Sequence, residues 1–405
     1  MAALFVLGPV AWSADAPALK DAYKGHFQVG TAVNRAIATG ASIRRSSEQL
    51  TKDVALVKDQ FNQLVAENDM KWVIIQPRPG PDGYDFAPSD AFVNFGLSNG
   101  MTLAGHTLVW HAQTPQWVFA GTNPPPPEVT NTLASVATDT NAQGTNRFGR
   151  RRFGGGFFGP YTGPRASREE LLGRMRDHIQ TVVSRYKGKV KVWDVVNEAI
   201  ADSGTNLLRN SLWLQIIWPD FIAKAFQYAH EADPDAILRY NDYSLENPAK
   251  RRKLITLIKS LQEQKIPVMA IGSQAHLNLS TSFEEMDQAL TELETLGLPI
   301  HITELDVNSA QGGQRSTGAD IANNATTTEG GLMDGSNRKL ADTYAGLFRA
   351  FLKHEHSVKI VTFWGANDAN SWRGNGRPLL FDGNCKPKPA FDAVIAEAVK
   401  ARAAK

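Results

Sequence analysis

The sequence contains almost no cysteine and no large excess of charge of either sign. Cys385 is the only cysteine in 405 residues, so an internal disulfide and a zinc site built from several thiolates are both excluded. The 43 basic residues nearly balance the 41 acidic ones, which leaves a formal net charge of +2. Because nucleic acids and anionic membranes are recognised by clustered positive charge, we expect neither as a partner. No spacing suggests a metal site, and we expect no cofactor.

The one long apolar run lies at the start of the chain and is too short to cross a membrane. It covers residues 2–12, about half of a transmembrane span. Small residues follow it, namely Ser13, Ala14 and Ala16, an arrangement typical of a secretory signal. We therefore predict that residues 1–20 form a signal-like or disordered N-terminus and that the protein is secreted or periplasmic.

Short apolar runs alternate with longer amphipathic segments along the rest of the chain. Eight runs predict strands, at residues 27–34, 63–67, 102–110, 189–198, 236–242, 268–276, 298–306 and 359–367. The amphipathic segments predict helices, at residues 168–186, 212–232, 248–264, 282–296 and 338–354. Near-continuous apolar strands separated by helices indicate a parallel sheet covered on both faces, and eight such units predict a closed (β/α)8 TIM barrel. A doubly wound open sheet is the alternative, which the count of eight disfavours.

Two polar segments interrupt this rhythm inside a single predicted domain of residues 21–405. Residues 121–166 contain four consecutive prolines and a stretch rich in arginine, phenylalanine and glycine, and residues 309–337 are rich in Gly, Ser, Thr and Asn. Such compositions bury little apolar surface and predict flexible loops. These loops follow the third and seventh strands, so they emerge at the barrel end where active sites lie, and a role in shaping a substrate cleft is the alternative.

Two carboxylates follow two strongly apolar strands. Glu198 ends the fourth predicted strand, and Glu304 lies near the end of the seventh. A single carboxylate at such a place could form a structural ion pair, since burying it without a partner is costly. Two of them converge on one mouth of a barrel, which is the arrangement that glycoside hydrolysis needs: one protonated acid and one ionised group.

Other strand ends carry aromatic, amide and charged side chains. These residues are Glu67, Asn68, Lys71, His106, Trp110, His111, Gln274, His276, Trp364 and Trp372. Sugars present C–H faces that stack on aromatic rings and hydroxyls that bond amides and charged groups. Each residue alone is more often part of the core, but together they indicate a polyol site.

Six stretches resemble the glycoside hydrolase family 10 endo-β-1,4-xylanases. They are Glu-Asn-Asp-Met-Lys-Trp at 67–72, His-Thr-Leu-Val-Trp-His at 106–111, Trp-Asp-Val-Val-Asn-Glu-Ala at 193–199, Gly-Ser-Gln-Ala-His at 272–276, Ile-Thr-Glu-Leu-Asp-Val at 302–307 and Thr-Phe-Trp-Gly at 362–365. They occur in the order typical of the family and cover the chain from about Phe27 to Phe391. The resemblance implies a TIM barrel and a retaining endo-xylanase that acts on xylan and xylo-oligosaccharides.

The resemblance also implies a role for each matching residue. Glu198 would be the acid/base and Glu304 the nucleophile, with His276 hydrogen-bonded to Glu304 and Asp306 behind it. The residues implied to bind substrate are Glu67, Asn68, Lys71, His106, Trp110, Asn197, Gln274, His276, Trp364 and Trp372. His111 and Asp194 would support these side chains from behind.

The chain departs from the family pattern at two places. Asp69 stands where a glutamate is usual, and the 121–166 segment is longer than is common, which leaves the product pattern open. A related barrel glycosidase that acts on cellulose or mannan is one alternative. A non-catalytic polysaccharide-binding or inhibitor protein is another, although it would be expected to lack one catalytic carboxylate. We expect a monomer.

Three motifs of other protein classes are discounted. Residues 96–100 match the Gly-x-Ser-x-Gly nucleophile elbow, but there the serine needs a strand before it and a helix after it, and here the order is reversed. We interpret this stretch as the end of a helix. Residues 154–159 match a dinucleotide-binding glycine pattern without the flanking strand and helix, and the arginine run at 150–152 is interpreted as a solvated loop rather than an RNA-binding segment.

Overall fold

Eight parallel strands close into a barrel in the computed structural model, which describes residues 16–121, 161, 163–309, 334–373 and 376–404. In chain order they are β1 (Gln28–Val33), β2 (Gln63–Ala66), β3 (Thr102–Trp110), β4 (Val192–Asn197), β5 (Ile237–Asp242), β6 (Ala270–Ser273), β8 (Ile300–Asn308) and β9 (Val358–Phe363). Each strand pairs in parallel with the next, β1 pairs with β9, and β6 pairs with β8, so the sheet has no free edge. The predicted (β/α)8 TIM barrel is confirmed.

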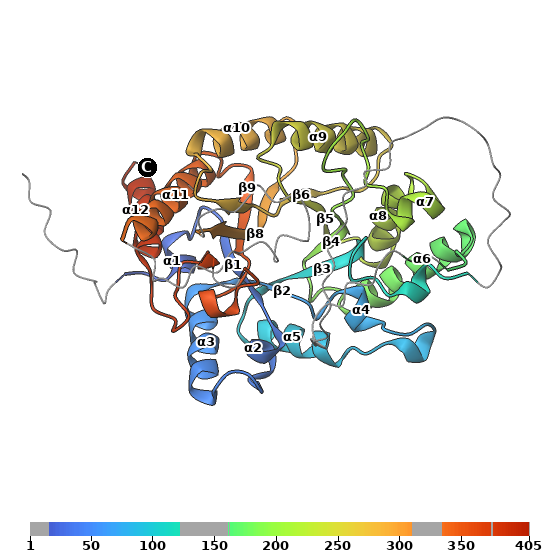
Figure 1. Ribbon diagram of the computed structural model, residues 1–405, viewed down its shortest axis with the longest axis horizontal. Coiled ribbons are helices and arrows are strands. Elements are labelled where there is room, and N and C mark those ends of the chain that lie inside the picture. Colours follow the sequence, from blue (N-terminus) through green and yellow to red (C-terminus); the bar gives the residue numbers. More distant parts are fainter. Residues whose placement is uncertain (1–15, 122–160, 162, 310–333, 374–375, 405) are drawn as a thin grey trace, which may run out of the picture.

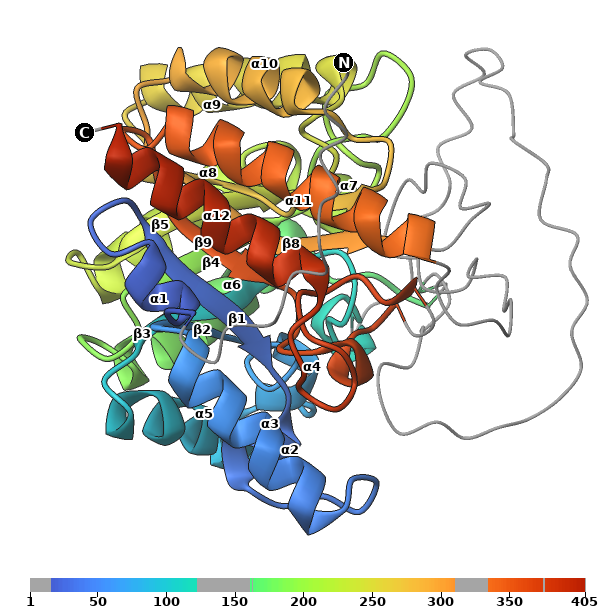
Figure 2. The ribbon, with the colours of Figure 1, turned by 90° about the vertical axis from the view of Figure 1, so that its left-hand side faces the viewer.

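Helices connect the strands and cover the outside of the barrel (Figures 1 and 2). They are α1 (Leu19–Ala22), α2 (Arg35–Thr39), α3 (Ser47–Gln60), α4 (Trp72–Ile75), α5 (Ala87–Ser98), α6 (Arg168–Arg185), α7 (Leu212–Ile217), α8 (Phe221–Ala232), α9 (Pro248–Glu263), α10 (Phe283–Glu294), α11 (Asp334–Lys353) and α12 (Pro389–Ala403). Short 3-10 turns lie at η1 (Pro81–Gly83), η2 (Gln116–Val118) and η4 (Asp368–Asn370). Because the helices run antiparallel to the strands, each connecting helix begins at the barrel end where the strands finish.

Two helices begin where the sequence carries a start signal. The Ser167 hydroxyl accepts a hydrogen bond from the Glu170 N–H, and the Glu170 carboxylate accepts one from the Ser167 N–H. Ser282 and Glu285 form the same reciprocal pair at the start of α10. Both pairs satisfy backbone donors that a helix leaves free at its first turn.

Three predicted elements differ in extent from the prediction. The helix expected over 212–232 is two helices, because Trp218 ends α7 with a positive φ of 77° and Pro219 follows it. The strand expected over 268–276 divides into β6 and the short β7 (His276–Asn278), because Ala275 has a left-handed φ of 58°. The last strand ends at Phe363 instead of residue 367, since the chain turns at Gly365, where φ is 129°.

The barrel interior has an apolar part and a polar part. Its small apolar cluster comes from alternating inward-facing residues of five strands, with Trp364 from the segment after β9: Ala32, Val65, Ala104, Val192, Ile360 and Trp364. The much larger cluster fills the space between the strands and the helices. The polar part contains buried ionisable side chains of the strands, such as Asp194, Arg239 and His301. The candidate site lies beyond them, at the carboxyl ends of the strands.

Several expectations concern segments that the structure describes only in part. Most of 121–166 and 309–337, the motifs at 150–152 and 154–159, and residues 1–15 lie outside the described residues. The stretch at 96–100 is described: α5 ends at Ser98 and β3 begins at Thr102, so the interpretation as a helix end is confirmed. Within the described ranges, none of the helices combines the length and the apolar character needed to span a membrane.

Candidate active site

Glu304 lies in β8 at the carboxyl end of the barrel and is 5% exposed. Its Oε1 accepts a hydrogen bond of 2.9 Å from the Asn241 amide, and its Oε2 lies 3.2 Å from Nε2 of His276. Burial raises the pKa of Glu304, but the hydrogen bond from His276 and the nearby charges of His106 and His276 outweigh it, so the pKa lies below its usual value. The site therefore keeps Glu304 ionised.

His276 lies between two buried carboxylates. Its Nδ1 is 3.1 Å from Oδ2 of Asp306, an ion pair whose angle falls outside hydrogen-bonding geometry. Burial lowers the pKa of His276, but the charge of Asp306 and the contacts with both carboxylates overcome this and raise it to about 9. Asp306 also accepts hydrogen bonds of 2.7 Å from the Trp372 indole and from Nε of Arg373. The imidazolium is therefore held in place from behind by a carboxylate with three partners.

Glu198 follows β4 and is also 5% exposed. Its Oε2 accepts a hydrogen bond of 2.8 Å from the Trp110 indole, and its Oε1 accepts one of 2.9 Å from the Gln274 amide. Both side-chain donors are neutral, whereas Glu304 contacts an imidazolium. The two carboxyl groups consequently have different electrostatic environments.

The backbone around Glu198 is held by side chains from the following strand and loop. Glu198 has a left-handed φ of 56°, which is uncommon for a residue with a side chain. Its carbonyl accepts a hydrogen bond of 3.0 Å from Nε of Arg209, and the N–H of Ala199 donates one of 3.0 Å to the Tyr240 hydroxyl. That hydroxyl in turn donates to Asp242 over 2.8 Å. These contacts fix the direction in which the Glu198 side chain leaves the strand.

Asn241 joins the two halves of the site. Its Nδ2 donates to Oε1 of Glu304 and to Oδ1 of Asn197, both over 2.9 Å, and its Oδ1 accepts from the Thr303 hydroxyl over 2.7 Å. The position of this amide depends on Gly272 in β6, where a Cβ atom would lie 2.3 Å from Oδ1 of Asn241. A glycine at that position therefore makes room for the Asn241 side chain.

The side-chain amide of Asn197 uses its oxygen but not its nitrogen in hydrogen bonds to the described residues. Its Oδ1 accepts from Asn241 and, over 3.3 Å, from Gln274, whereas its Nδ2 is buried and has no partner among the described residues. A buried donor without a partner is costly, and such groups in native structures commonly await a ligand or water. The Asn197 amide is thus available to bind a substrate hydroxyl.

His106 belongs to a buried charged group within the barrel. Its Nδ1 lies 3.0 Å from Oδ2 of Asp194, which also accepts hydrogen bonds of 2.6 and 3.1 Å from Arg239. Burial raises the pKa of Asp194, but the charge of Arg239 and the contact with His106 lower it to about 2. The Asp194 carboxylate therefore orients the His106 ring.

Glu67, Asn68 and Lys71 lie together just beyond β2. The Lys71 ammonium is 3.0 Å from Oδ1 of Asn68 and 5.1 Å from the centre of the Trp110 ring. Burial raises the pKa of Glu67 and lowers the pKa of Lys71, and the attraction between the two charges offsets part of each effect. Asp69, the departure from the family pattern, forms an ion pair of 2.7 Å with Arg35.

Two tryptophans stand beside the histidines of the site. The Trp364 ring meets the His106 and His276 rings edge-on, with centroids 5.3 and 6.4 Å apart. The Trp372 ring lies 4.9 Å from the His276 ring. The structure thus brings every predicted substrate-binding residue to the carboxyl end of the barrel or to the segments that follow its strands.

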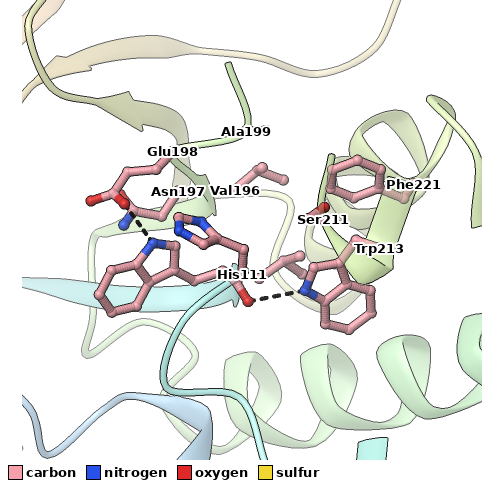
Figure 3. A pocket seen from close by; sticks show the side chains of 10 residues that line it. His111, Val196, Asn197, Glu198, Ala199, Ser211, Trp213 and Phe221 are labelled. Atoms are coloured by element: carbon pink, nitrogen blue, oxygen red, sulfur yellow. Dashed lines mark hydrogen bonds between the residues drawn. The ribbon is translucent and has the colours of Figure 1, made fainter. Parts of the chain in front are cut away.

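A small cavity lies behind Glu198 on the side of α7 and α8 (Figure 3). It is lined by Val109, Trp110, His111, Val196, Asn197, Glu198, Ala199, Ser211, Trp213 and Phe221. Burial lowers the pKa of His111 to about 3, so this ring is neutral, and its Nδ1 has no partner among the described residues. The Trp213 indole donates to the carbonyl of Trp110 over 3.0 Å, which ties α7 to the end of β3.

The sequence prediction missed five residues that hold the site together: Arg209, Arg239, Tyr240, Asn241 and Arg373. Arg239 and Asn241 alternate with Leu238 and Tyr240 in β5, so polar residues at every second position of the 236–242 run were the available signal. Arg209 and Arg373 lie in loops, where nothing in the local sequence indicates a partner. Among the described residues, no group of His, Cys, Asp and Glu side chains is arranged to hold a metal ion.

Comparisons with known proteins agree on one family. The sequence profile of glycosyl hydrolase family 10 matches residues 18–141 and 160–397. An endo-1,4-beta-xylanase of Geobacillus stearothermophilus is 38% identical over 387 residues, covering 94% of this chain and 98% of that protein. A beta-1,4-xylanase of Dictyoglomus thermophilum is 34% identical over 387 residues, covering 94% and 90%.

Solved structures show the same similarity. The structure of a GH10 endoxylanase from a sugarcane soil metagenome matches with a TM-score of 0.76 at 34% identity, covering 94% of this chain and 99% of that one. A xylanase from Paenibacillus barcinonensis, complexed with a conduramine derivative, matches with a TM-score of 0.74 at 32% identity, covering 95% and 99%.

Proposed function

The chain belongs to glycosyl hydrolase family 10 and is an endo-1,4-β-xylanase, and on this premise we propose that it cleaves internal β-1,4-xylosidic bonds of xylan with retention of the anomeric configuration. The observation that carries the proposal is the difference between the two buried carboxyls. Glu304 contacts the His276 imidazolium, whereas the side chain of Glu198 receives its hydrogen bonds, among the described residues, from the neutral Trp110 and Gln274.

The difference assigns one role to each carboxyl. An ionised Glu304 is the group that can attack a sugar carbon, and its lowered pKa keeps it ionised. Glu198 is the second carboxyl of the site, and we assign it the acid role, in which it gives a proton to the leaving oxygen. Retaining glycosidases use two carboxyls in these two roles.

In the first step, Glu304 attacks the anomeric carbon of the sugar and forms a covalent ester with it. The bond from that carbon to the bridging oxygen breaks, and the oxygen takes the proton of Glu198 as the shortened chain leaves. Forming the ester removes the negative charge of Glu304. The ionised Glu198 is then placed to act as the base of the second step.

In the second step, Glu198 takes a proton from a water molecule, and that oxygen attacks the anomeric carbon. The ester bond to Glu304 breaks, so both carboxyls return to their starting forms. Because each step inverts the carbon, the product keeps the original β configuration.

The surrounding residues supply groups that a xylose ring can use. The unpartnered Nδ2 of Asn197 is a donor for a hydroxyl next to the reacting carbon. Trp364 and Trp372 offer indole surfaces for C–H faces, and Glu67, Asn68 and Lys71 offer a cluster of donors and acceptors for further hydroxyls. Binding energy from these contacts can orient the chain across Glu198 and Glu304.

Proton NMR of xylohexaose hydrolysis tests the stereochemical part of the proposal. We expect the β-anomer of the new reducing end to accumulate first and to convert to the α-anomer afterwards by mutarotation. Initial accumulation of the α-anomer would contradict the covalent intermediate, because it requires a single inversion.

Aryl xylobiosides with good and poor leaving groups test the role of Glu198. The Glu198→Ala variant should lose much more activity on a poor leaving group, which needs protonation, than on a good one. An equal loss on both substrates would count against an acid role, and wild-type enzyme measured on the same pair provides the control.

We further propose that the enzyme is exported, on the basis of the signal-like sequence at 1–20 and of its substrate xylan, a polymer found outside cells. We also propose that it is a monomer. Cell fractionation with an activity assay tests export, and activity confined to the cytoplasm would contradict it. Sedimentation equilibrium tests the monomer, for which the sequence mass is 44.3 kDa.

A further inference from the structure

Trp218 is an exposed tryptophan at a backbone position that suits glycine. The side chain is 68% exposed, whereas the seven other tryptophans of the described residues are buried or half-buried. Its φ of 77° and ψ of −179° lie in a region that only glycine adopts without strain. This residue therefore carries two costs, a strained backbone and a large apolar surface left in water.

Neighbouring residues explain why the backbone at Trp218 has this conformation, but they do not explain why the position carries an indole side chain. The Trp218 N–H donates to the carbonyl of Leu214 over 3.0 Å, and the Trp218 carbonyl accepts from the N–H of Phe221 over 3.1 Å. Ile217 on one side and Phe221 on the other are buried. The turn between α7 and α8 thus needs this backbone shape, and a glycine would supply it at lower cost. Neither packing nor turn geometry accounts for the indole. Because strained residues cluster at functional sites, a ligand of the indole is the remaining explanation.

Trp218 lies at the same end of the barrel as the catalytic carboxyls. It precedes α8, which leads to the start of β5, so the first residues of α8 are at the carboxyl end of the strands. Trp213 and Phe221, which flank Trp218 in the sequence, line the cavity behind Glu198 (Figure 3). The turn that presents the indole therefore joins two residues that border the cavity behind Glu198.

Polar groups accompany the indole at this rim. Asp220 is two residues further along the chain and pairs with Arg168 at the start of α6, where Nη1 lies 3.0 Å from Oδ1. Both side chains are partly exposed, at 35% and 43%. An exposed aromatic face near charged donors and acceptors suits a pyranose, which offers C–H faces to the ring and hydroxyls to the charges.

From these observations we infer that Trp218, with Arg168 and Asp220, forms an accessory site that binds a β-1,4-linked xylose chain outside the catalytic subsites. The inference rests on the proposed function, since the polymer that reaches the carboxyl end of the barrel is the substrate. A second contact on the same polymer raises the effective concentration of the chain near Glu198 and Glu304 without changing the chemistry of cleavage.

Removal of the Trp218 indole should lower activity on polymeric xylan and leave activity on a short substrate unchanged. The Trp218→Ala variant should keep wild-type kcat/KM on an aryl xylobioside, because on this inference Trp218 lies outside the catalytic subsites that this substrate fills. On insoluble xylan we expect kcat/KM to fall about three- to tenfold, the range of one aromatic contact. The Trp218→Phe variant, which keeps an aromatic ring, should retain most of the polymer activity.

Glycine provides a matched control for the backbone. Trp218→Gly removes the same indole as Trp218→Ala but relieves the strain, so we expect it to be the more stable of the two, with a melting temperature higher by about 1–3 °C. Equal polymer losses in both variants would show that the indole, and not the strained turn, makes the contact.

Binding is measured separately from cleavage in the Glu304→Ala background. Depletion of this protein from solution by insoluble xylan, with xylotriose saturating the catalytic subsites, should weaken when Trp218→Ala is added. Unchanged depletion and unchanged polymer activity would overturn the inference, and so would an equal loss on the aryl xylobioside, because Trp218 would then act through the active site. Wild-type activity on the aryl xylobioside reports the proposed function independently, so its absence would indicate failure of that proposal instead.

Discussion

The charge on His276 makes the stability of this protein depend on pH in a defined window. The pKa of His276 lies at about 9 in the folded chain, against 6.5 for an ordinary imidazole. The folded state therefore binds this proton more tightly than the unfolded state does. The stabilisation is fully present below pH 6.5 and is lost as the pH rises through 9.

The magnitude follows from the difference between the two pKa values. At about 1.4 kcal/mol for each pKa unit, the step from 6.5 to about 9 corresponds to about 3 kcal/mol of unfolding free energy. His276 is only 7% exposed, so solvent screening reduces this figure little. A loss of this size is a large fraction of the stability of a typical protein.

Urea unfolding at a series of pH values from below 6.5 to above 9 measures the effect. Wild-type protein should lose stability across this window, whereas His276→Asn, which has no titrating ring, should start lower and change less. His178→Asn is a matched control, because burial lowers the pKa of His178 to about 3 and this ring is neutral throughout the window. Its pH dependence should follow the wild type.

Identical pH dependence in wild type and His276→Asn would show that His276 does not produce the loss of stability. It would mean that the imidazole does not hold its proton between Glu304 and Asp306. The assignment of Glu304 as the ionised nucleophile would then lose its main support, since the hydrogen bond from His276 is the largest influence that lowers its pKa.

Three further variants test particular contacts. Asn241→Ala removes the donor to Glu304, and we expect kcat on an aryl xylobioside to fall by about 10- to 100-fold, the range of a hydrogen bond to a charged group; an unchanged kcat would rule out a positioning role. Tyr240→Phe leaves the Ala199 N–H without its acceptor and should slow poor leaving groups more than good ones, whereas a uniform loss would point to a general defect in folding. Ser167→Ala removes the cap of α6, and urea unfolding should show a destabilisation of about 1 kcal/mol with kcat unchanged, in contrast to the other two.

Most of the barrel could be predicted because buried parallel strands are read directly from apolar runs. The predicted runs fall on the observed strands, and the serine–glutamate pairs at Ser167 and Ser282 mark true helix starts. The errors have local backbone causes. Ala275 and Trp218 adopt positive φ values, which interrupt a strand and a helix. The residue type of Ala275 gives no sign of this, whereas Pro219 after Trp218 is a signal for a helix end.

The sequence predicted those residues of the candidate site whose position within a single strand is unusual, and it did not predict contacts between different strands and loops. Glu198 and Glu304 stand out because a carboxylate follows an apolar run. The dependence of Asn241 on Gly272, and of Glu198 on Arg209, joins residues from different elements, and only the closed barrel brings them together. The charges of His276 and Glu304 likewise depend on neighbours distant in sequence, whose effect on the two pKa values outweighs that of burial.

Hydrolysis of xylan by Glu304 and its partners can be measured as reducing-sugar release from xylan, glucan and mannan by purified wild-type protein beside the Glu304→Ala variant. We expect release from xylan that the substitution abolishes, with little release from the other two polymers. Release mainly from glucan or mannan, or activity on xylan that survives the loss of Glu304, would contradict this expectation.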